Sequence, residues 1–268
     1  MKILVTGATG RVGRQLVEEL AGHEVIATTS KQTPPDVVDG RRWLQADLSD
    51  PTPWPRLIQN CDAAFLFPAF GHTQAFIDAA ARVGLPKLVL LSSGAVSDQE
   101  QSFIKAIHSE IEHSARSSGT PTITIRPTVF MSNDLQWVQA IRAQEPVRVA
   151  FPEAAMPAIA EHDVAAAIAT CLTHDAGTDV FEVTGPRTLT QIDRLEILAE
   201  KYTSRRVPWT DITDEARTNG YPGMPGPPGD YLLRNLADAA ATPVPSTDVF
   251  EQLVGRPGLD YADWVALQ

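Results

Sequence analysis

The sequence of 268 residues contains few cysteines and has no excess of positive charge. Its two cysteines, Cys61 and Cys171, lie far apart and show no CxxC or Cys/His ligand spacing, so neither a disulfide framework nor a metal site is expected. Lys and Arg number 22 against 33 Asp and Glu, and the formal charge of −11 gives no general attraction to nucleic acid or to an anionic membrane. A small-molecule partner is therefore favoured.

Long apolar runs are also missing, because none approaches the length that would span a membrane. No basic segment or cleavage site precedes the first apolar strand, so a cytoplasmic location is expected. The hydrophobic content of 43% is enough for one large α/β domain or for a domain with an appended lobe. The oligomeric state does not follow from these features, and a homodimer stays open.

The most informative motif is at residues 1–20, where MKILVTGATGRVGRQLVEEL runs from an apolar strand through a glycine-rich turn into an amphipathic helix. In this order Gly7 allows the sharp turn, Gly10 lets the backbone approach a phosphate, and Gly13 lets the helix pack closely on the strand. The unpaired N–H groups and the positive dipole end of the helix beginning near Arg11 then face the phosphates. The motif predicts a dinucleotide site; a glycine-rich turn without a ligand is the alternative.

Short β-rich runs alternate with helical patterns through the first half of the chain. Strands are expected at 23–29, 43–46, 63–67, 87–91 and 122–125, and the clearest helices between them at 73–83 and 101–117. This βαβ repetition predicts an α/β fold with a Rossmann-type doubly wound parallel sheet.

After Pro127 the βαβ rhythm ends. Helices are expected near 135–143, 163–173, 190–202, 231–241 and 247–254, with a strand at 179–184. The stretch GYPGMPGPPG at 220–229 is expected to be irregular and to serve either as a lid or as a surface connector. We expect an NADP-binding Rossmann domain at 1–151, and at 152–268 a smaller C-terminal α/β substrate lobe that is partly interleaved with the Rossmann sheet.

The choice of dinucleotide can be argued from the end of the second strand, where an NAD-specific fold places Asp or Glu on the ribose 2′-hydroxyl. Here that stretch is Thr28-Thr29-Ser30-Lys31, which has no carboxylate to repel a 2′-phosphate. Its hydroxyls, Lys31 and Arg11 suit a 2′-phosphate, so NADP(H) is favoured over NAD(H). The cofactor contacts predicted from the glycine turn and this strand end are Gly7, Thr9, Gly10, Arg11, Val12, Gly13, Thr29, Ser30 and Lys31.

Several segments together resemble the NmrA-like branch of the atypical short-chain dehydrogenase/reductase superfamily of NAD(P)H-binding proteins. They include VTGATGRVG, ADLSD, LLSSGA, SGTPTITIRPTVFMSN, EHDVAAAI and FEVTGPRTLTQIDRLEILAEKY, followed by a strand at RRVPW and by LVGRPGLDYADW. The resemblance implies that Asp47 and Leu48 hold the adenine, that Phe67 and Pro68 flank the nicotinamide, and that Ser92, Ser93 and Gly94 shape the reaction end. Asp47 as a helix cap and the serines as partners of local backbone are the alternatives.

Typical short-chain dehydrogenases have a catalytic Tyr-x-x-x-Lys dyad on the helix after the fifth strand, which here is the helix at 101–117. When Glu112 is matched to the acidic residue that often follows the lysine, Lys falls on His108 and Tyr on Ile104, so the dyad is missing. A ketone needs the tyrosine proton as hydride arrives, whereas an acceptor that yields a delocalised anion can collect a proton afterwards. Quinones, enones and azo or cationic dyes are acceptors of this kind, and the quinone, azo and triphenylmethane reductases of the family resemble this case.

His108 and Ser93 are the candidate catalytic residues. His108 could bond the nicotinamide ribose or supply a proton; a buried structural histidine is the alternative. Substrate contacts are expected from Phe70, Phe130, Met131 and Asn133, because aromatic and Met side chains suit a flat apolar molecule. For each of them core packing is the alternative, since most Phe and Met residues belong to the core.

The hypothesis that follows is an NADPH-dependent reductase that transfers hydride to a small conjugated or aromatic acceptor without the dyad. Two alternatives stay open. The first is a non-catalytic protein of NmrA type that senses NADP and regulates another protein, and the second is a tailoring enzyme on the same fold that performs a redox-neutral rearrangement.

Overall fold

The computed structural model describes residues 1–31, 42–177 and 179–268, and these residues form two compact units. The first unit consists of Met1–Asp98, Lys105–Arg126 and Glu161–Glu182. The second consists of Gln99–Ile104, Pro127–Ala160 and Val183–Gln268. Because each unit is assembled from separate segments, the domains expected at 1–151 and 152–268 stay a prediction.

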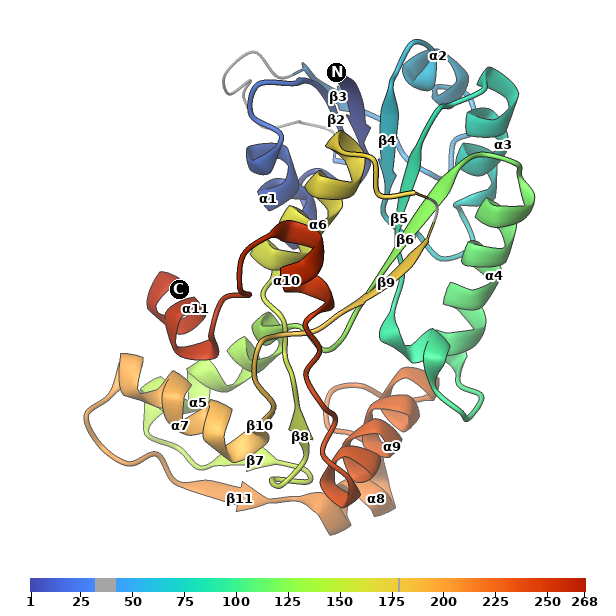
Figure 1. Cartoon of the computed structure of the whole chain (residues 1–268). Helices are drawn as coiled ribbons and strands as arrows, with labels where there is room; N and C mark the ends of the chain where they lie inside the picture. The colour runs from blue at the N-terminus through green and yellow to red at the C-terminus, as the bar shows by residue number, and fades with distance from the viewer. Residues whose placement is uncertain (32–41, 178) are drawn as a thin grey trace. The chain divides into compact units, whose positions relative to one another are not determined.

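The first unit contains the predicted Rossmann-type parallel sheet, which is confirmed. Its seven strands lie in the order β3-β2-β1-β4-β5-β6-β9 (Figure 1). The strands are β1 (Lys2–Val5), β2 (Glu24–Thr29), β3 (Arg42–Gln45), β4 (Ala63–Leu66), β5 (Leu88–Leu91), β6 (Thr122–Pro127) and β9 (Val180–Val183). Strand order reverses between β1 and β4, and in sheets of this type ligands bind beyond the carboxyl ends of the strands at that point.

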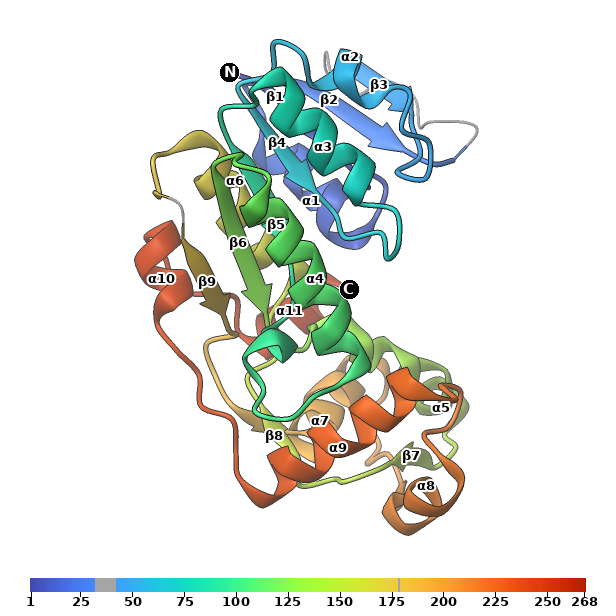
Figure 2. The same cartoon turned by 90° about the vertical axis from the view of Figure 1, so that its right-hand side faces the viewer.

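Helices cover both faces of this sheet. Helices α1 and α6 lie on one face, and α3 and α4 lie on the other, where Figure 2 shows them in front of the strands. The helical elements are α1 (Arg11–Glu19), α2 (Trp54–Ile58), α3 (Gln74–Val83), the 3₁₀ turn η1 (Gly94–Ser97), α4 (Phe103–Ser117) and α6 (Glu161–Thr173). The apolar spacing that predicted helices at 73–83 and 101–117 thus gives α3 and α4, with the buried faces turned to the sheet.

Apolar side chains of strands and helices form the core between the sheet and α2, α3 and α4. Trp54 and Phe76 are fully buried and meet edge to face, with ring centroids 5.2 Å apart. They pack with Leu4 and Leu88 of the strands. Burial of each such side chain contributes about 1.5–3 kcal/mol, so this core holds the strand ends in fixed positions.

The second unit is a mixture of helices and two small sheets, β10 with β8 antiparallel and β11 with β7 parallel. Its strands are β7 (Val147–Val149), β8 (Ala155–Met156), β10 (Leu189–Thr190) and β11 (Trp209–Asp211). Its helical elements are the 3₁₀ turn η2 (Met131–Trp137), α5 (Val138–Ala143), α7 (Gln191–Tyr202), α8 (Thr213–Asn219), α9 (Pro227–Ala241), α10 (Val249–Val254) and α11 (Tyr261–Leu267). One of its apolar cores packs α7 with Met131, Tyr261 and Trp264.

Helix α7 begins as predicted, because Thr190 and Asp193 form a capping box in which each side chain accepts a backbone N–H. The expectation of an irregular 220–229 segment is wrong at its end, since α9 already begins at Pro227. Proline is tolerated at the first helical position, where its missing N–H would have no partner. The strand expected at 205–209 instead runs over Trp209–Asp211, where it pairs with β7. Among the described residues, no helix has the length and apolar character needed to cross a membrane.

Candidate cofactor and active site

The glycine turn between β1 and α1 has the geometry that the sequence predicts. Gly7 has a φ of +62°, a conformation that favours glycine, and Gly10 N–H donates to the carbonyl oxygen of Gly7 at 2.9 Å. A Cβ on Gly13 would lie 2.2 Å from that same oxygen, so only glycine lets α1 approach the turn this closely. A Cβ on Gly10 would lie 3.1 Å from it, which is a tight contact.

The N-terminus of α1 is open to an anion. Gly10 is its N-cap and has no side chain that could hydrogen-bond the N–H groups of the first turn. All residues of that turn are described by the structure, and none of them is acidic. The backbone N–H groups of such a turn, with the positive end of the helix dipole, are the donors that hold a pyrophosphate. Thr9, Arg11 and Val12 lie on this turn, with Arg11 exposed and Val12 buried. These features fit a dinucleotide.

Thr6 fixes the turn to the neighbouring strand end. Its buried hydroxyl donates to the carbonyl oxygen of Phe65 at 3.1 Å and accepts the N–H of Phe67 at 2.7 Å. The Cβ of Phe67 lies 3.2 Å from the position of a Cβ on Gly7, so this residue borders the glycine turn. The Phe67 side chain is 42% exposed, whereas Pro68 is buried. An aromatic ring therefore stands at the surface beside the turn.

The end of β2 lies against the same turn. The hydroxyls of Thr9 and Thr29 are hydrogen-bonded at 3.0 Å, and Thr29 also accepts the N–H of Lys31 at 3.2 Å. Thr29 is buried, while Ser30 and Lys31 are exposed. The structure thus brings the predicted cofactor residues of the turn and the strand end together, with Ser30 and Lys31 free to face solvent.

Asp47 forms a local turn at the end of β3. Its Oδ1 accepts both the N–H and the hydroxyl of Ser49, each at 2.8 Å. These hydrogen bonds hold the pKa of the exposed Asp47 carboxyl below its ordinary value. Asp47 does not cap the helix that follows, because the N-cap of α2 is Pro53. The Leu48 side chain packs against the apolar core.

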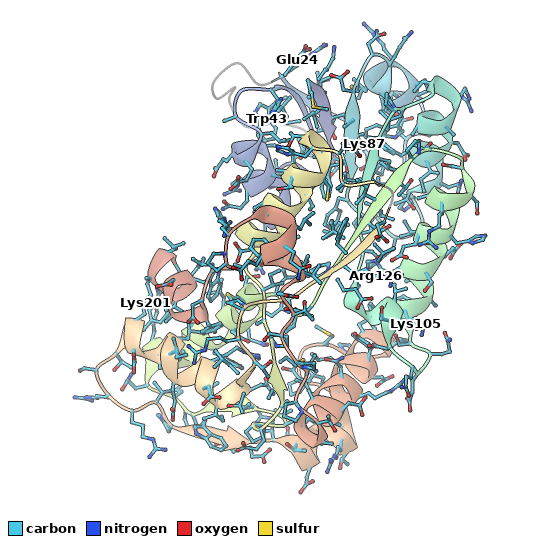
Figure 3. All side chains as sticks on the ribbon, viewed as in Figure 1. Glu24, Trp43, Lys87, Lys105, Arg126 and Lys201 are labelled. Carbon is cyan, nitrogen blue, oxygen red and sulfur yellow. The ribbon has the colours of Figure 1, made fainter. Side chains whose placement is uncertain are left out.

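A buried carboxylate on α4 organises the ends of β5 and β6. Glu112 is 2% exposed; its Oε1 accepts the Ser92 hydroxyl at 2.6 Å and Arg126 Nε at 2.9 Å. Its Oε2 accepts Arg126 Nη2 at 2.7 Å and Arg116 Nη2 at 3.0 Å. Arg126, labelled in Figure 3, lies within β6 and thereby ties this strand to α4. The Ser92 hydroxyl therefore donates its proton to Glu112 and has none left to donate to a ligand.

The charges in this network hold one another in their ionised forms. Burial alone would raise the pKa of Glu112, but the hydrogen bonds from Arg126 and Ser92 outweigh it and bring the pKa below its ordinary value. The hydrogen bond to Glu112 in turn raises the pKa of Arg126. Arg126 Nη1 also donates to Ser97 at 3.0 Å and to Glu182 at 3.1 Å. Sequence reasoning missed Ser97 and Glu182, because nothing in their local sequence signals partners so far along the chain.

Ser93 has a different environment from Ser92. Its hydroxyl oxygen accepts the N–H of Ala95 at 3.2 Å and so caps the short turn η1. The side chain is half-buried. A hydroxyl that accepts in this way still has its proton to donate, so Ser93 can hydrogen-bond an acceptor oxygen.

His108 is buried within the first unit and contacts a predicted substrate residue. It is 7% exposed, and its ring meets that of Phe70 edge to face, with centroids 5.3 Å apart and an angle of 87°. Its Nδ1 has no hydrogen-bond partner in the described part of the chain. Burial lowers the pKa of His108 against the opposing effect of Glu112, so the ring is neutral at pH 7. Phe70 is 46% exposed.

The other predicted substrate residues belong to the second unit. Phe130 is half-buried and pairs through a backbone bridge with Ile159. Met131 is buried in the apolar core, and the neighbouring Asn133 is exposed. Met131 thus lies in an apolar core, which was the alternative to a substrate contact. No group of His, Cys, Asp and Glu side chains that could hold a metal ion is present in the described ranges.

Comparison with known proteins places these features in context. The sequence model of a family described as NAD(P)H-binding matches residues 7–175. A reductase from Streptomyces griseus, named for (4-alkanoyl-5-oxo-2,5-dihydrofuran-3-yl)methyl phosphate, is 31% identical and is covered over 96% of its length by 98% of this chain. The NAD(P)H azoreductase of Xenophilus azovorans is 25% identical, with the same shares covered.

The fold is found in solved structures as well. The NADPH-dependent quinone oxidoreductase of Escherichia coli, in its complex with NADPH, is similar with a TM-score of 0.77 and 20% sequence identity over 99% of both chains. At this identity the likeness concerns the fold.

Proposed function

Because this chain belongs to the NAD(P)H-binding family and is an NAD(P)H-dependent oxidoreductase, we propose that it uses NADPH to reduce a small conjugated acceptor. The observation that carries the proposal is the glycine turn, where an uncapped α1 lies beside Gly7, Gly10 and the exposed ring of Phe67. When bound, the dihydronicotinamide supplies a hydride. The residues of the chain orient this ring and the acceptor.

NADPH is proposed over NADH on the basis of the strand end after β2. Ser30 and Lys31 are exposed beside the glycine turn, and residues 28–31 include no carboxylate. A 2′-phosphate would receive hydrogen bonds from hydroxyls there and positive charge from Lys31, whereas NADH would gain nothing from that charge. Arg11, exposed at the start of α1, lies on the same turn and adds to this preference.

The proposed contacts along the cofactor follow the order of the strand ends. Asp47 and Leu48 after β3 contact the adenine, and Phe67 and Pro68 after β4 flank the nicotinamide. The Ser92 hydroxyl is held by Glu112, so its contribution is through the backbone of the turn that it fixes. Ser93, which retains a proton to donate, faces the reacting end.

The acceptor is proposed to be conjugated because the chain has Ile104 and His108 where the tyrosine and lysine of the dyad are expected. A conjugated acceptor delocalises the negative charge left by hydride addition and takes its proton from water or from a weak acid. Quinones, enones and azo compounds all meet this requirement. Phe70 is proposed to contact the acceptor. The substrate contacts predicted at Phe130, Met131 and Asn133 belong to the second unit and stay predictions.

Of these acceptors, the enone class is favoured by the relative with 31% identity. The name of that relative describes an unsaturated lactone with an alkanoyl group on the ring and a phosphate ester. Its ring double bond is conjugated with carbonyl groups, as the missing dyad requires. We therefore propose an unsaturated lactone of this type, with a phosphate ester, as the acceptor.

His108 is proposed to hydrogen-bond a ribose hydroxyl of the cofactor. A neutral imidazole is a poor acid, and burial keeps His108 neutral at pH 7, which favours this role over proton supply. Its unpartnered Nδ1 gives it a group with which to bond.

The test follows NADPH absorbance with quinones, azo dyes and unsaturated lactones as acceptors. NADPH oxidation that depends on the conjugated acceptor, with saturated lactones inert, is the expected result. Tight NADPH binding together with no turnover of any acceptor would instead support the sensor of NmrA type. A redox-neutral tailoring enzyme would change its substrate without consuming NADPH, which mass analysis of the products detects.

A further inference from the structure

A groove on the surface of the second unit lies between the end of α7 and strand β11, and the proposed reaction does not involve it. Residues 203–208 connect these two elements (Figure 1). The groove has a volume of about 380 Å³, and its floor is apolar, with the buried side chains of Leu195, Ala199 and Val207. Trp209 also lines it and is 36% exposed. A tryptophan at the surface beside an apolar floor is typical of a residue that anchors an interface.

Four exposed charged side chains border the same groove. Glu196 and Glu200 belong to α7, and Arg205 and Arg206 follow it in the chain. Although their charges are opposite, none of these four side chains forms an ion pair or a hydrogen bond within the part of the chain that the structure describes. Two carboxylates and two guanidinium groups are therefore available to a partner.

The two carboxylates are placed unfavourably for the isolated chain. Glu196 and Glu200 are four residues apart, so they lie on one face of α7 and repel each other. Glu200 also lies in the last turn, where the helix dipole favours a cation. The Lys201 amino group is directed elsewhere, because it donates to the carbonyl oxygens of Val265 at 2.9 Å and Ala266 at 3.2 Å. Positive charge from a partner would remove this cost.

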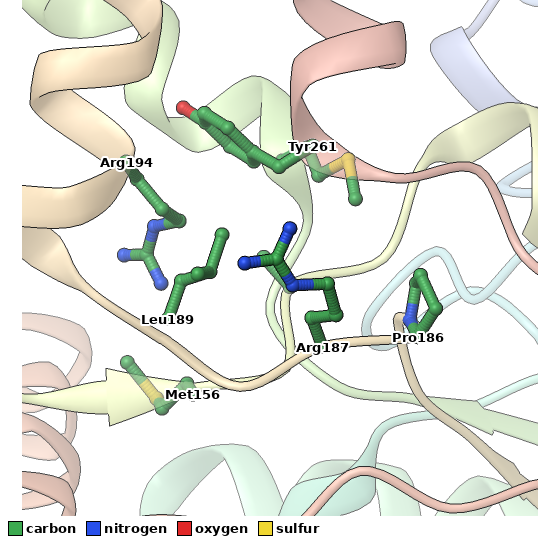
Figure 4. Close-up of a pocket in the computed structure, with 8 residues that line it drawn as sticks. Met156, Pro186, Arg187, Leu189, Arg194 and Tyr261 are labelled. Carbon is green, nitrogen blue, oxygen red and sulfur yellow. The ribbon is translucent and has the colours of Figure 1, made fainter.

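Helix α7 is fixed in place on its inner side. Arg194 Nε and the Tyr261 hydroxyl both donate to the buried Asp134 Oδ2, each at 2.8 Å. Figure 4 shows Arg194 and Tyr261, and the space beside them is too narrow for a water molecule. The groove therefore lies on a helix that is already ordered, which reduces the entropy lost when a partner binds.

We propose that this groove is the surface through which two copies of the chain form a dimer with twofold symmetry. In such a dimer both copies use the same surface, so its acidic part must meet its basic part. Glu196 and Glu200 of one protomer pair with Arg205 and Arg206 of its partner, and the reverse pairs form at the same time. The two Trp209 rings cover the apolar floor between these pairs.

The charges favour a second copy over a partner of another kind. A nucleic acid or another anionic ligand would meet the two carboxylates of α7, and a basic protein would meet the two guanidinium groups. The net charge of −11 opposes association of two copies in general, so association depends on local pairs of this kind. Strand β11 extends the same surface, because all its residues are exposed and, among the described residues, it pairs with β7 alone. Its other edge is thus open to a strand of the partner.

The first test measures association of the full chain by analytical ultracentrifugation between ~1 and ~100 μM, the range of a moderately stable dimer. A monomer–dimer equilibrium is expected, and added salt should weaken it by screening the exposed charges. Trp209→Ala should raise the Kd of the dimer about tenfold or more, because it removes the aromatic anchor. The matched control is Phe103→Ala, which removes an exposed aromatic ring elsewhere in the second unit and should leave the Kd unchanged.

An exchange of charges tests the twofold pairing. One double variant carries Glu196→Arg and Glu200→Arg, and the other carries Arg205→Glu and Arg206→Glu. Each alone should have a Kd raised about a hundredfold or more, because every pair then joins like charges. An equimolar mixture of the two should form a heterodimer with about the Kd of the wild type, since each reversed pair then meets its opposite.

The control for the first double variant is Glu153→Arg with Asp238→Arg, two exposed positions outside the groove. It changes the net charge equally and should leave the Kd unchanged. Circular dichroism verifies that each variant is folded. If either double variant is not folded, the single changes Glu200→Arg and Arg206→Glu replace it in the same design.

The outcomes decide the proposal without any measurement of turnover, so the proposed function stands or falls separately. A wild type that stays monomeric up to ~100 μM overturns the dimer. A dimer whose Kd is unchanged in Trp209→Ala and in both charge variants overturns the groove as its interface. Folded charge variants that do not associate on mixing, or that form complexes larger than a dimer, overturn the twofold pairing.

Discussion

The Ser92 hydroxyl donates to the buried Glu112 carboxylate at 2.6 Å and so joins the end of β5 to the middle of α4. The turn that follows Ser92 carries Ser93, which is proposed to face the reacting end, and the position of the turn depends on this contact. Arg126 binds both oxygens of the same carboxylate, which makes the ion pair bidentate. One buried charge therefore fixes two strand ends at the proposed site.

Substitution of Glu112 should destabilise the protein and do so in a pH-dependent way. Glu112→Gln keeps the shape but removes the charge opposite Arg126, and a cost of about 1–3 kcal/mol in the free energy of unfolding is expected. Because the pKa of Glu112 is lowered on folding, its contribution is complete above its ordinary value of 4.5 and is lost as pH falls below it. Urea unfolding at a series of pH values measures both effects.

The matched control for this prediction is Glu110→Gln on the same helix, where the side chain is exposed. It should change the free energy of unfolding by less than about 0.5 kcal/mol at any pH. If Glu110→Gln and Glu112→Gln gave parallel pH curves, the network around Glu112 would have no special part in stability.

The two glycines of the turn should respond differently to the same added methyl group. Gly13→Ala places a Cβ 2.2 Å from the Gly7 carbonyl oxygen and should lower stability by about 1–3 kcal/mol, since the backbone itself must shift. Gly10 has a φ of −71°, and a Cβ there would lie 3.1 Å from the Gly7 carbonyl oxygen, a tight contact that a shift of a few tenths of an ångström relieves, so Gly10→Ala should lower stability much less than Gly13→Ala. It should instead weaken NADPH binding, measured by calorimetry, because the methyl group enters the space assigned to the phosphates. Unchanged NADPH affinity in a folded Gly10→Ala protein would place the pyrophosphate elsewhere.

The alternation of strands and helices in the first half of the chain was enough to predict the parallel sheet. Buried runs such as Leu88–Leu91 and the helical spacing around Phe76 are local signals, and the core depends on them. The glycine turn was predictable for the same reason, since Gly7, Gly10 and Gly13 are defined by backbone geometry within one short segment.

The second unit was less predictable because its elements are stabilised by distant partners. Strand β11 exists through pairing with β7, whose residues precede it by about sixty positions; each strand has only three residues, and those of β11 are all exposed. The Arg194 contact with Asp134 spans a similar separation. Such contacts leave no trace in local spacing, so the pairing of Arg194 with Asp134 could not have been predicted from the sequence.

Cofactor preference should reverse when a carboxylate is placed at the end of β2. Ser30→Asp puts a negative charge where the 2′-phosphate of NADPH is proposed to lie, and it gives the 2′-hydroxyl of NADH an acceptor. The Kd for NADPH is expected to rise about tenfold or more, and the Kd for NADH to fall. Calorimetry with both cofactors measures the ratio. Ser204→Asp adds the same charge at an exposed position of the second unit and should leave the ratio unchanged.

Replacement of His108 by phenylalanine distinguishes a bond to the ribose from proton supply. The aromatic contact with Phe70 is retained in His108→Phe, while both ring nitrogens are lost. If His108 holds the ribose, Kd for NADPH should rise about tenfold, and the pH dependence of kcat should keep its shape. A large fall in kcat with a changed pH profile and unaltered NADPH affinity would assign proton supply to His108. No change in either quantity would leave it a structural histidine.

The same variant should change the acid stability of the protein. The pKa of His108 is lowered on folding by burial, so the unfolded chain takes up a proton more readily than the folded one. The wild type should therefore lose stability as pH falls below the ordinary histidine value of 6.5, a range well above that of Glu112. His108→Phe should remove this part of the loss and leave the steeper fall below 4.5 intact. Thermal unfolding between these two values, in wild type and variant, separates the histidine from the carboxylate, because only the histidine contribution disappears with the substitution.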